Sequence, residues 1–288
     1  MTEASQLESA LAQLNGWESE FCASAHLAVG ASEPSVGSVK AGLCNRYAPR
    51  APRLASLTRL SAPARRQRSL PHMMTRWGGE YEEVQPTLHH VPGTISSPIL
   101  QVLIELGLRE KVEVKTLTFP ELKQAAHLAV NPMGTSPAFQ DGEVRIWESQ
   151  AVLTHLLEMH DTSHRLHPPP RTSKRVKHLH LQTFLMATVY PHVASLYLHT
   201  LKPAEEQDAT YVSASKSKWT QTIAPALVDA LADQPYLLGD EISAVDLVIA
   251  KPLRNADSLG LLVAFPTLDA LFRRIAARSS FAQAYAIS

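Results

Sequence analysis

Apolar residues follow strand-like and helix-like spacings in turn between Thr87 and His160. The segments TLHHV (87–91) and VEVKTL (112–117) read as strands. Between them, SSPILQVLIELGL (96–108) has apolar residues at helical spacing and a stop at Gly107. A shorter helix is predicted through LKQAAHLAV (122–130), because the following Asn131-Pro132 step cannot continue a helix.

A hairpin and a further helix complete this pattern. PAFQ (137–140) and EVRIW (143–147) flank Asp141-Gly142, a pair that suits a type I′ turn. SQAVLTHLLEMH (149–160) is amphipathic, and Ser149 is the expected N-cap. The order β-α-β-α-β-β-α predicts a thioredoxin-like α/β domain over residues 85–162.

The pattern becomes helical throughout after a proline-rich linker, RLHPPPR (165–171), within residues 163–171. Long helices are predicted through 172–200 and 205–233, then one from Ser243 and another from about Thr267. Ser243 and Asp246 form a capping-box variant, with Ile242 and Leu247 placed as a hydrophobic staple. We therefore interpret Asp246 as structural, within an all-helical domain over residues 172–288.

Residues 1–84 have a different composition, which predicts a low-complexity, disordered extension. From residue 46 to residue 76 the chain holds arginines at 46, 50, 53, 59, 65, 66, 68 and 76 and no acidic residue. That bias is typical of an organelle transit segment, for a plastid or a mitochondrion. The glutamates at 3, 8, 18, 20 and 33 argue instead for a cytoplasmic protein, and both interpretations stay open.

Charge and cysteine content narrow the function classes. The 27 basic residues balance 27 acidic ones, so neither nucleic acid nor an anionic membrane is an expected partner. No apolar run approaches the roughly 20 residues that cross a bilayer. Two cysteines, Cys22 and Cys44, make no Cys-x-x-Cys pair, and the 13 histidines include no His-Glu-x-x-His. No metal site is predicted.

Two motifs resemble those of the glutathione S-transferase superfamily. NPMGTSPAFQDGEVRIWESQAVLTHL (131–156) is similar to its glutathione-binding signature, and LLGDEISAVDLVIA (237–250) resembles its second marker, in the helical domain. The opening HHVPGTISSPILQVLIELGL (89–108) is nearest to the bacterial and fungal branch. The resemblance covers about residues 85–285 in the family's order.

The resemblance implies a glutathione site. Pro137 is expected in cis, turning the backbone of Ser136 outward to pair with the cysteinyl backbone of glutathione. Glu148 and Ser149 stand where the γ-glutamyl group lies in the family. A carboxylate can hold the amine, and a hydroxyl with free helix amides suits the ligand carboxylate. The alternative is local: Ser149 as a plain N-cap and Glu148 as a first-turn acid.

One position departs from the family pattern. Many relatives place Lys or Gln two residues before the cis-Pro, where it meets the glycyl carboxylate, and here that residue is Thr135. A neutral hydroxyl lacks a charge-assisted bond, so weaker glutathione binding or a shifted pose is expected. Gln124 and Lys123 are alternative partners for the carboxylate.

The family takes its thiol-activating group from the segment that joins the first strand to the first helix, here VPGTISSPIL (91–100). It holds no Cys and no Tyr, so a mixed disulfide with the protein is not expected. Counting back from ELGL (105–108) places Thr94 at the hydroxyl position of serine-type relatives, and a one-residue shift would place Gly93 there. Ser96 is the second candidate, followed by Ser97, although either serine also suits the helix N-cap.

The resemblance implies a glutathione transferase, with glutathione as co-substrate and a small hydrophobic electrophile as the second substrate. The electrophile is expected near Tyr190, His192, Tyr197 and His199, which equally suit helix packing. A homodimer is the usual family assembly. Two alternatives stay open: a non-catalytic interaction module like that of elongation-factor gamma subunits or of some regulators, and a glutathione-dependent isomerase or lyase.

Overall fold

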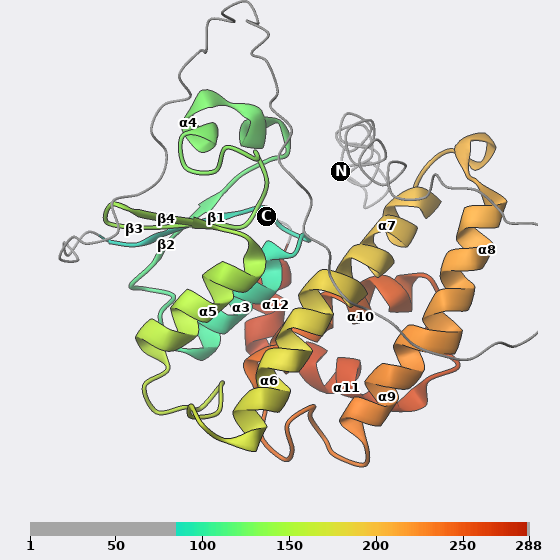
Figure 1. The fold of residues 1–288 in the computed structure, drawn as a ribbon. Coiled ribbons are helices and arrows are strands. Elements are labelled where there is room, and N and C mark those ends of the chain that lie inside the picture. The colour runs from blue at the N-terminus through green and yellow to red at the C-terminus, as the bar shows by residue number, and fades with distance from the viewer. Residues whose placement is uncertain (1–84, 287–288) are drawn as a thin grey trace, which may run out of the picture. The chain divides into compact units, whose positions relative to one another are not determined.

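A four-stranded mixed sheet forms the centre of the first domain (Figure 1). The computed structural model describes residues 85–286, so the expectations for residues 1–84, Cys22 and Cys44 lie outside the described residues. The strands are β1 (Thr87–His90), β2 (Glu113–Thr116), β3 (Ala138–Asp141) and β4 (Val144–Trp147). Their order is β2-β1-β3-β4, with β1 parallel to β2 and the other pairs antiparallel.

Helices cover both faces of this sheet. They are α3 (Ser96–Glu105), a 3₁₀ turn (Pro120–Lys123), α4 (Ala125–Leu128) and α5 (Ser149–His160). Figure 1 shows α3 and α5 on one face and α4 on the other. Leu88, Ile99 and Phe139 are fully buried between the sheet and the helices α3 and α5. The regularly spaced apolar residues of each strand and helix lie on the side that faces this core. The predicted order of elements is confirmed, and the domain is thioredoxin-like.

The hairpin between β3 and β4 differs from the predicted type I′ turn. Asp141 pairs with Val144, so Asp141 belongs to the strand and the loop is Gly142-Glu143. Gly142 has a φ of 57°, whereas Glu143 is not among the residues with positive φ. A type I′ turn requires positive φ at both central residues. Gly142 therefore occupies the first central position, as glycine does in type II′ turns.

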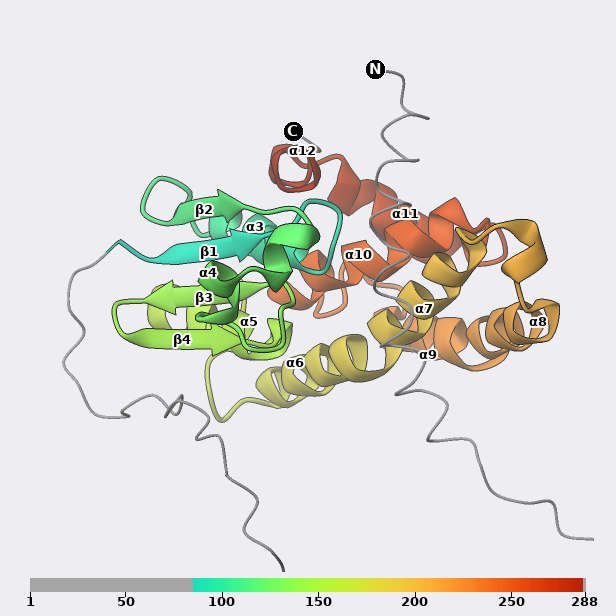
Figure 2. The same cartoon turned by 90° about the horizontal axis from the view of Figure 1, so that it is seen from above.

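The second domain is helical. Its helices are α6 (Ser173–Phe184), α7 (Tyr190–Thr200), α8 (Ala209–Lys218), α9 (Ala224–Leu231), α10 (Ala244–Ser258), α11 (Pro266–Ala276) and α12 (Ser279–Tyr285), with a short 3₁₀ turn at Ala204–Glu206. Figure 2 shows this domain beside the sheet. The short α12 was not predicted, because its segment SSFAQAY has little apolar periodicity.

The two long helices predicted through residues 172–200 and 205–233 each contain a π-helical turn. These turns span Leu185–Val189 and Trp219–Ile223, and each is followed within two residues by a proline, Pro191 or Pro225. Proline has no amide hydrogen and its ring clashes with the carbonyl four residues earlier. A wider turn before the proline lets the helix continue past that position.

The buried helix α10 joins the two domains. Twelve of its 15 residues are buried, and it packs against α3 of the first domain and α7 and α11 of its own. The predicted capping box is present: the Asp246 carboxylate accepts the Ser243 backbone amide at 2.8 Å. The Leu237 amide, from the preceding loop, donates to the same carboxylate at 2.8 Å. Asp246 therefore fixes both the start of α10 and the loop before it.

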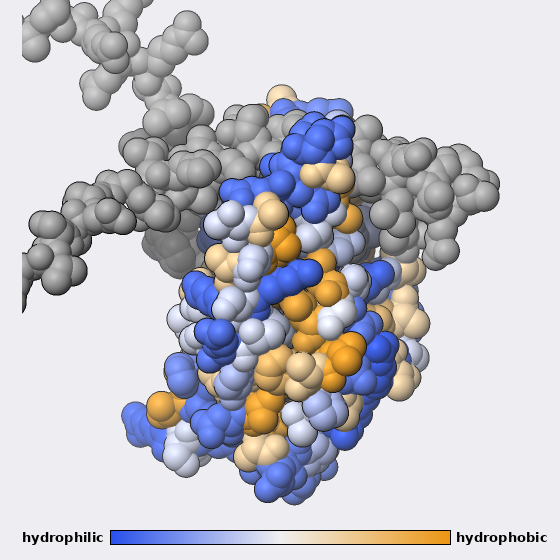
Figure 3. Space-filling view, turned by 90° about the vertical axis from the view of Figure 1, so that its right-hand side faces the viewer, coloured by the Kyte–Doolittle hydropathy of each residue, from blue (hydrophilic) through white to orange (hydrophobic). Residues whose placement is uncertain are grey.

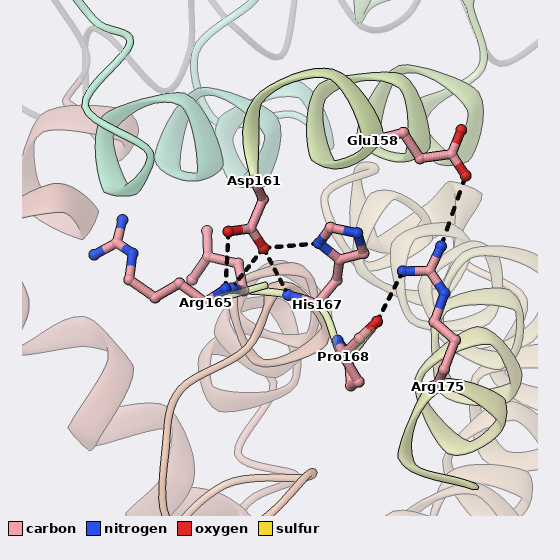
Figure 4. Close-up of polar contacts among 7 residues, drawn as sticks. Glu158, Asp161, Arg165, His167, Pro168 and Arg175 are labelled. Atoms are coloured by element: carbon pink, nitrogen blue, oxygen red, sulfur yellow. Dashed lines mark hydrogen bonds and ion pairs between the residues drawn. The ribbon is translucent and has the colours of Figure 1, made fainter. Parts of the chain in front are cut away.

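A second buried carboxylate, Asp161, organises the linker (Figure 4). It accepts the backbone amides of Arg165, Leu166 and His167 at 2.8, 2.7 and 2.9 Å, and His167 Nδ1 lies 2.7 Å away. Burial alone would raise the pKa of Asp161, but the His167 ring and these amides together lower it. The Leu166 carbonyl in turn accepts the Ala244 amide at 2.8 Å, which ties the linker to the start of α10.

No helix within residues 85–286 is long and apolar enough to cross a bilayer. Figure 3 views the side of the molecule that carries α8 and α9, where apolar residues gather in a band flanked by polar ones.

Candidate functional site

Three segments of the predicted site meet at one edge of the sheet. The strand β1 ends at His90 and leads into the loop that carries Thr94. Ala138, the first residue of β3, pairs with His89 near that end and also with Trp147, the last residue of β4. The Ser136-Pro137 step before β3 and the Glu148-Ser149 pair after β4 therefore lie at the same edge as the Thr94 loop.

The loop between β1 and α3 contains three hydroxyl groups in different positions. Thr94 is half-buried, whereas Ser96 and Ser97 are fully buried. Thr94 Oγ1 donates to the Val91 carbonyl at 2.8 Å and lies 2.8 Å from Ser96 Oγ. Ser97 Oγ accepts the Gly93 amide at 3.1 Å. Of these three residues, Thr94 is therefore the one that keeps exposed surface.

Neither serine caps the helix. Helix α3 begins at Ser96 itself and its N-cap residue is Ile95, so the N-cap prediction is wrong. The Ser96 amide donates instead to Thr94 Oγ1 at 3.2 Å. Ser96 Oγ bonds instead to the Val91 carbonyl at 3.0 Å and to His90 Nδ1 at 2.8 Å. Burial lowers the pKa of His90 to about 4, so this network is neutral at physiological pH.

The Ser136-Pro137 peptide bond is cis, as predicted. Ser136 Oγ donates to the His89 carbonyl of β1 at 3.2 Å, which fixes the step against the sheet. The loop hydrogen bonds of the described residues include none to the amide or carbonyl of Ser136. Both groups are therefore available to a peptide that lies alongside, as an added strand would.

Sequence reasoning missed a buried group that holds the residue before this step. Asn131 Nδ2 donates to the Thr135 carbonyl at 2.8 Å and to Thr135 Oγ1 at 3.0 Å, and His127 Nε2 lies 2.9 Å from the same carbonyl. Because Oγ1 already accepts a hydrogen bond, the Thr135 hydroxyl hydrogen is free to donate. Thr135 can thus offer one neutral bond where many relatives offer Lys or Gln.

The His127 ring also fixes a second buried histidine. A carbonyl can only accept, so His127 Nε2 carries the hydrogen and its Nδ1 is the acceptor in the neutral ring. His89 Nδ1, 2.8 Å away, must then donate. Burial, with His127 and Lys115 nearby, lowers the pKa of His89 to about 4, and burial also lowers that of His127. No spacing in the sequence indicates this pair, which forms between β1 and α4.

Lys123 lies against the same loop. Gly134 has a φ of 61°, and a Cβ there would meet Leu122 O at 3.0 Å and Lys123 Cδ at 3.1 Å. The Lys123 stem therefore packs over Gly134, next to Thr135, while Gln124 is exposed at the N-cap of α4. Of the two alternative partners for a glycyl carboxylate, Lys123 is the one packed against this loop.

Glu148, and not Ser149, occupies the N-cap position of α5. Helix α5 begins at Ser149, and no side chain bonds its first amides, so the prediction that Ser149 caps the helix is wrong. Glu148 is exposed and has a φ of 70° and a ψ of 118°, a conformation that costs about 1–3 kcal/mol for a residue with a side chain. The free amides at this N-terminus are suited to an anionic group.

The four residues predicted near the electrophile divide into two pairs. His192 Nε2 donates to the Ser215 carbonyl at 3.0 Å, and His199 Nε2 accepts the Asp208 amide at 2.7 Å. Both histidines are thus engaged in packing α7 against α8 and the loop before it. Tyr197 and Tyr190 lie elsewhere: Tyr197 is near Lys251 of α10. Burial raises the pKa of Tyr190 to about 12. A hydrogen bond with the backbone of Ile95, the neighbour of Thr94, lowers the pKa by less than burial raises it.

Comparisons with known proteins agree with this geometry. Residues 84–158 match the family model "Glutathione S-transferase, N-terminal domain", and residues 189–279 match "Glutathione S-transferase, C-terminal domain". Glutathione S-transferase F9 of Arabidopsis thaliana is 30% identical over 155 residues, which is 51% of this chain and 70% of that one. Glutathione S-transferase D6 of Drosophila melanogaster is 24% identical over 166 residues, 56% of this chain and 73% of that one.

Solved structures share the fold. A glutathione transferase homolog from Lodderomyces elongisporus, solved with two GSH per subunit, superposes with a TM-score of 0.63 and 20% identity over 70% of this chain and 98% of that one. A sphingomonad glutathione S-transferase complexed with glutathione gives a TM-score of 0.59 and 24% identity over 69% of this chain and 96% of that one. With both domain models matched in order, the chain belongs to the glutathione S-transferase superfamily.

Proposed function

We propose that this protein is a glutathione transferase that joins the glutathione sulfur to a small electrophile. The observation that carries the proposal is the shared sheet edge. There the half-buried residue Thr94, the open backbone of Ser136 and the uncapped N-terminus of α5 lie together. These groups match the thiol, the cysteinyl backbone and the γ-glutamyl carboxylate of one peptide.

Thr94 would stabilise the thiolate of bound glutathione. A free thiol has a pKa of about 8.5 and is mostly protonated at neutral pH. The Val91 carbonyl has two hydroxyl donors, Thr94 at 2.8 Å and Ser96 at 3.0 Å. Thr94 can therefore turn its hydrogen toward a thiolate while Ser96 still bonds that carbonyl. The thiolate then attacks the electrophile, and a carbon–sulfur bond forms as the leaving group departs.

Titration calorimetry of the full chain with glutathione, followed by turnover of a panel of aryl halides, epoxides and unsaturated ketones, tests this proposal. Saturable binding with turnover of at least one substrate supports a transferase. Binding without any turnover would favour the non-catalytic module, and isomerisation or cleavage without a conjugate would favour an isomerase or lyase. Absence of glutathione binding would contradict the transferase and the isomerase or lyase, and would leave only the interaction module.

Removing the polar groups at the start of α5 should weaken glutathione binding. Glu148→Gln and Ser149→Ala should each cost about 1.5–3 kcal/mol, the usual worth of a hydrogen bond to a charged group. That corresponds to a dissociation constant about ten to a hundred times larger. Calorimetry on the full chain measures it. The control is Glu143→Gln, an exposed acid in the β3–β4 loop, which should bind glutathione like the wild type.

Loss of the Thr94 hydroxyl should slow the reaction at neutral pH. Thr94→Ala should lower turnover by about tenfold and raise the apparent pKa of the bound thiol, because one unit of pKa is worth about 1.4 kcal/mol. Thr94→Ser should retain most activity. Thr220→Ala, an exposed position before α9, is the control. A pH–rate profile of Thr94→Ala equal to that of the wild type would remove Thr94 from the mechanism.

A further inference from the structure

A buried lysine without an anionic partner lies in the centre of the helical domain. Lys251, on α10, is 7% exposed, and its Nζ donates to Asn255 Oδ1 at 2.8 Å. The same ammonium group lies 5.9 Å from the centre of the Tyr197 ring on α7. Among the described residues, no carboxylate forms an ion pair with it. An amide and an aromatic ring balance this charge only in part.

A second cation and a free hydroxyl lie next to it. Arg254 follows Lys251 by three residues, so both side chains leave the same face of α10. Its guanidinium lies 5.3 Å from the centre of the Tyr285 ring of α12, and within residues 85–286 it makes no ion pair. Tyr285 is 5% exposed, and its buried hydroxyl has no hydrogen-bond partner among those residues. Two cations thus lack a counter-ion, and the hydroxyl beside them lacks a hydrogen-bond partner.

This group borders the proposed thiol site. Tyr190 interacts electrostatically with Tyr285, and its hydroxyl bonds the backbone of Ile95, the neighbour of Thr94. The helices α10 and α12 that carry the three donors both pack against α3, which starts at the same loop. Tyr190 therefore connects this group of donors to the loop that carries Thr94.

The energetics indicate that an anion is the missing partner. A buried charge without a counter-ion is costly, and a buried donor without an acceptor costs about 1–3 kcal/mol. Burial, with Arg254 nearby, lowers the pKa of Lys251 to about 7, so the lysine is partly charged at neutral pH. An apolar residue at this position would avoid that cost. A bound anion would hold the lysine in its charged form and supply the acceptor.

We infer that Lys251, Arg254 and the Tyr285 hydroxyl bind the anionic group of the electrophile, so that preferred substrates carry a carboxylate. The inference rests on the proposed function and names the class of its second substrate. Two tyrosines of α7 neighbour these donors: Tyr197 lies near Lys251, and Tyr190 interacts electrostatically with Tyr285. Their rings offer apolar contact to the body of an aromatic substrate, beyond which the cations meet its charge.

Binding and turnover are measured separately on the full chain. Calorimetry with 3,5-dinitrobenzoate and with its methyl ester compares an anion with its neutral match and requires no reaction. Kinetics with 4-chloro-3,5-dinitrobenzoate and its methyl ester compare the same pair as substrates of glutathione. In that reaction the sulfur–carbon bond forms, the carbon–chlorine bond breaks and chloride leaves. Each kcat/KM is divided by the uncatalysed rate constant to remove intrinsic reactivity.

The wild type should bind the acid more tightly than the ester. Lys251→Met and Arg254→Gln should each lower the acid-to-ester ratio about tenfold or more, in binding and in kcat/KM, because a hydrogen bond to a charged group is lost. Tyr285→Phe should lower the acid-to-ester ratio without lowering the free energy of unfolding, since the hydroxyl has no hydrogen-bond partner in the described residues. Arg274→Gln is the matched control, because this arginine also lies over a ring, that of Tyr236, at 5.6 Å.

Two results separate the inference from the proposed function. Equal binding of acid and ester by the wild type, or an acid-to-ester ratio that survives Lys251→Met and Arg254→Gln, would overturn the anion site even if both esters and acids are conjugated. Absence of turnover with a clear preference for the acid in calorimetry would support the anion site and overturn the transferase.

Discussion

Asp246→Ala should lower the free energy of unfolding by about 3–5 kcal/mol. Asp246 is fully buried and accepts the amides of Ser243 and Leu237 as well as the Ser243 hydroxyl. Alanine leaves all three donors buried without an acceptor, and each such donor costs about 1–3 kcal/mol. The loss is large because α10 packs against both domains, so the start of this helix cannot fray locally.

Urea denaturation followed by circular dichroism measures this loss. Asp246→Asn keeps one acceptor oxygen and should fall between alanine and the wild type. Asp257→Ala is the control at the other end of the same helix. Its carboxylate pairs with exposed Arg273 at 2.8 Å, an interaction worth at most about 1 kcal/mol. Equal losses for Asp246→Ala and Asp257→Ala would show that the capping box contributes little.

Acidification from pH 7 to about pH 4.5 should destabilise the protein by several kcal/mol. Burial lowers the pKa of His89, His90 and His178 to about 4, each from an ordinary value of 6.5. The unfolded chain therefore takes up protons near pH 6.5 that the folded chain takes up only near pH 4. The stabilisation is complete above pH 6.5 and is lost as the pH falls toward 4.

The size of the destabilisation follows from the difference between the pKa of each histidine in the folded chain and in the unfolded chain. A shift of about 2.5 units corresponds to at most about 3 kcal/mol for each histidine. Three such residues together approach the whole stability of an ordinary domain, about 5–15 kcal/mol. Urea denaturation at a series of pH values should show the free energy of unfolding falling by up to about 4 kcal/mol per pH unit between pH 6 and 4.5. A flat profile there would contradict the burial of these rings as neutral groups.

His178 offers the sharpest variant for this test. Both of its ring nitrogens are buried without a hydrogen-bond partner in the described residues. In His178→Leu, unfolding should therefore take up about one proton fewer than in the wild type, so the free energy of unfolding should fall less steeply with decreasing pH. The variant should also be more stable than the wild type at pH 5. His180→Gln, two residues further along α6 and exposed, should leave the profile unchanged.

Local patterns were sufficient to predict most of the fold. The order of strands and helices in residues 87–160 follows from apolar spacing and from turn residues, and the structure confirms it. The capping box at Asp246 was also predicted from a short motif, whereas the cis bond at Pro137 was expected from the family resemblance. The order of elements and the capping box depend on residues a few positions apart, so the sequence alone contains their physical cause.

Two predicted positions, the hairpin loop and the N-cap of α5, were wrong by one residue, because contacts across the sheet overrode the local signals. The hairpin loop is Gly142-Glu143 because the strand pairing includes Asp141, although Asp-Gly suits a tight turn. Glu148 takes the N-cap position of α5 in place of Ser149, with a backbone conformation that no propensity favours. In both cases pairing and packing across the sheet decide the register. These contacts are not visible in a single segment.

Only the tertiary structure separated the hydroxyls of the β1–α3 loop and found the groups that support the site. Thr94 keeps exposed surface while Ser96 is buried against His90, a difference set by the packing of β1 on α3. Arg254 and Tyr285 meet because α10 and α12 both pack on α3. Burial and contacts between distant segments set the charge, exposure and partners of such side chains. The sequence by itself therefore determined which groups are present and in which element, and the folded chain decided which of them are buried, exposed or paired.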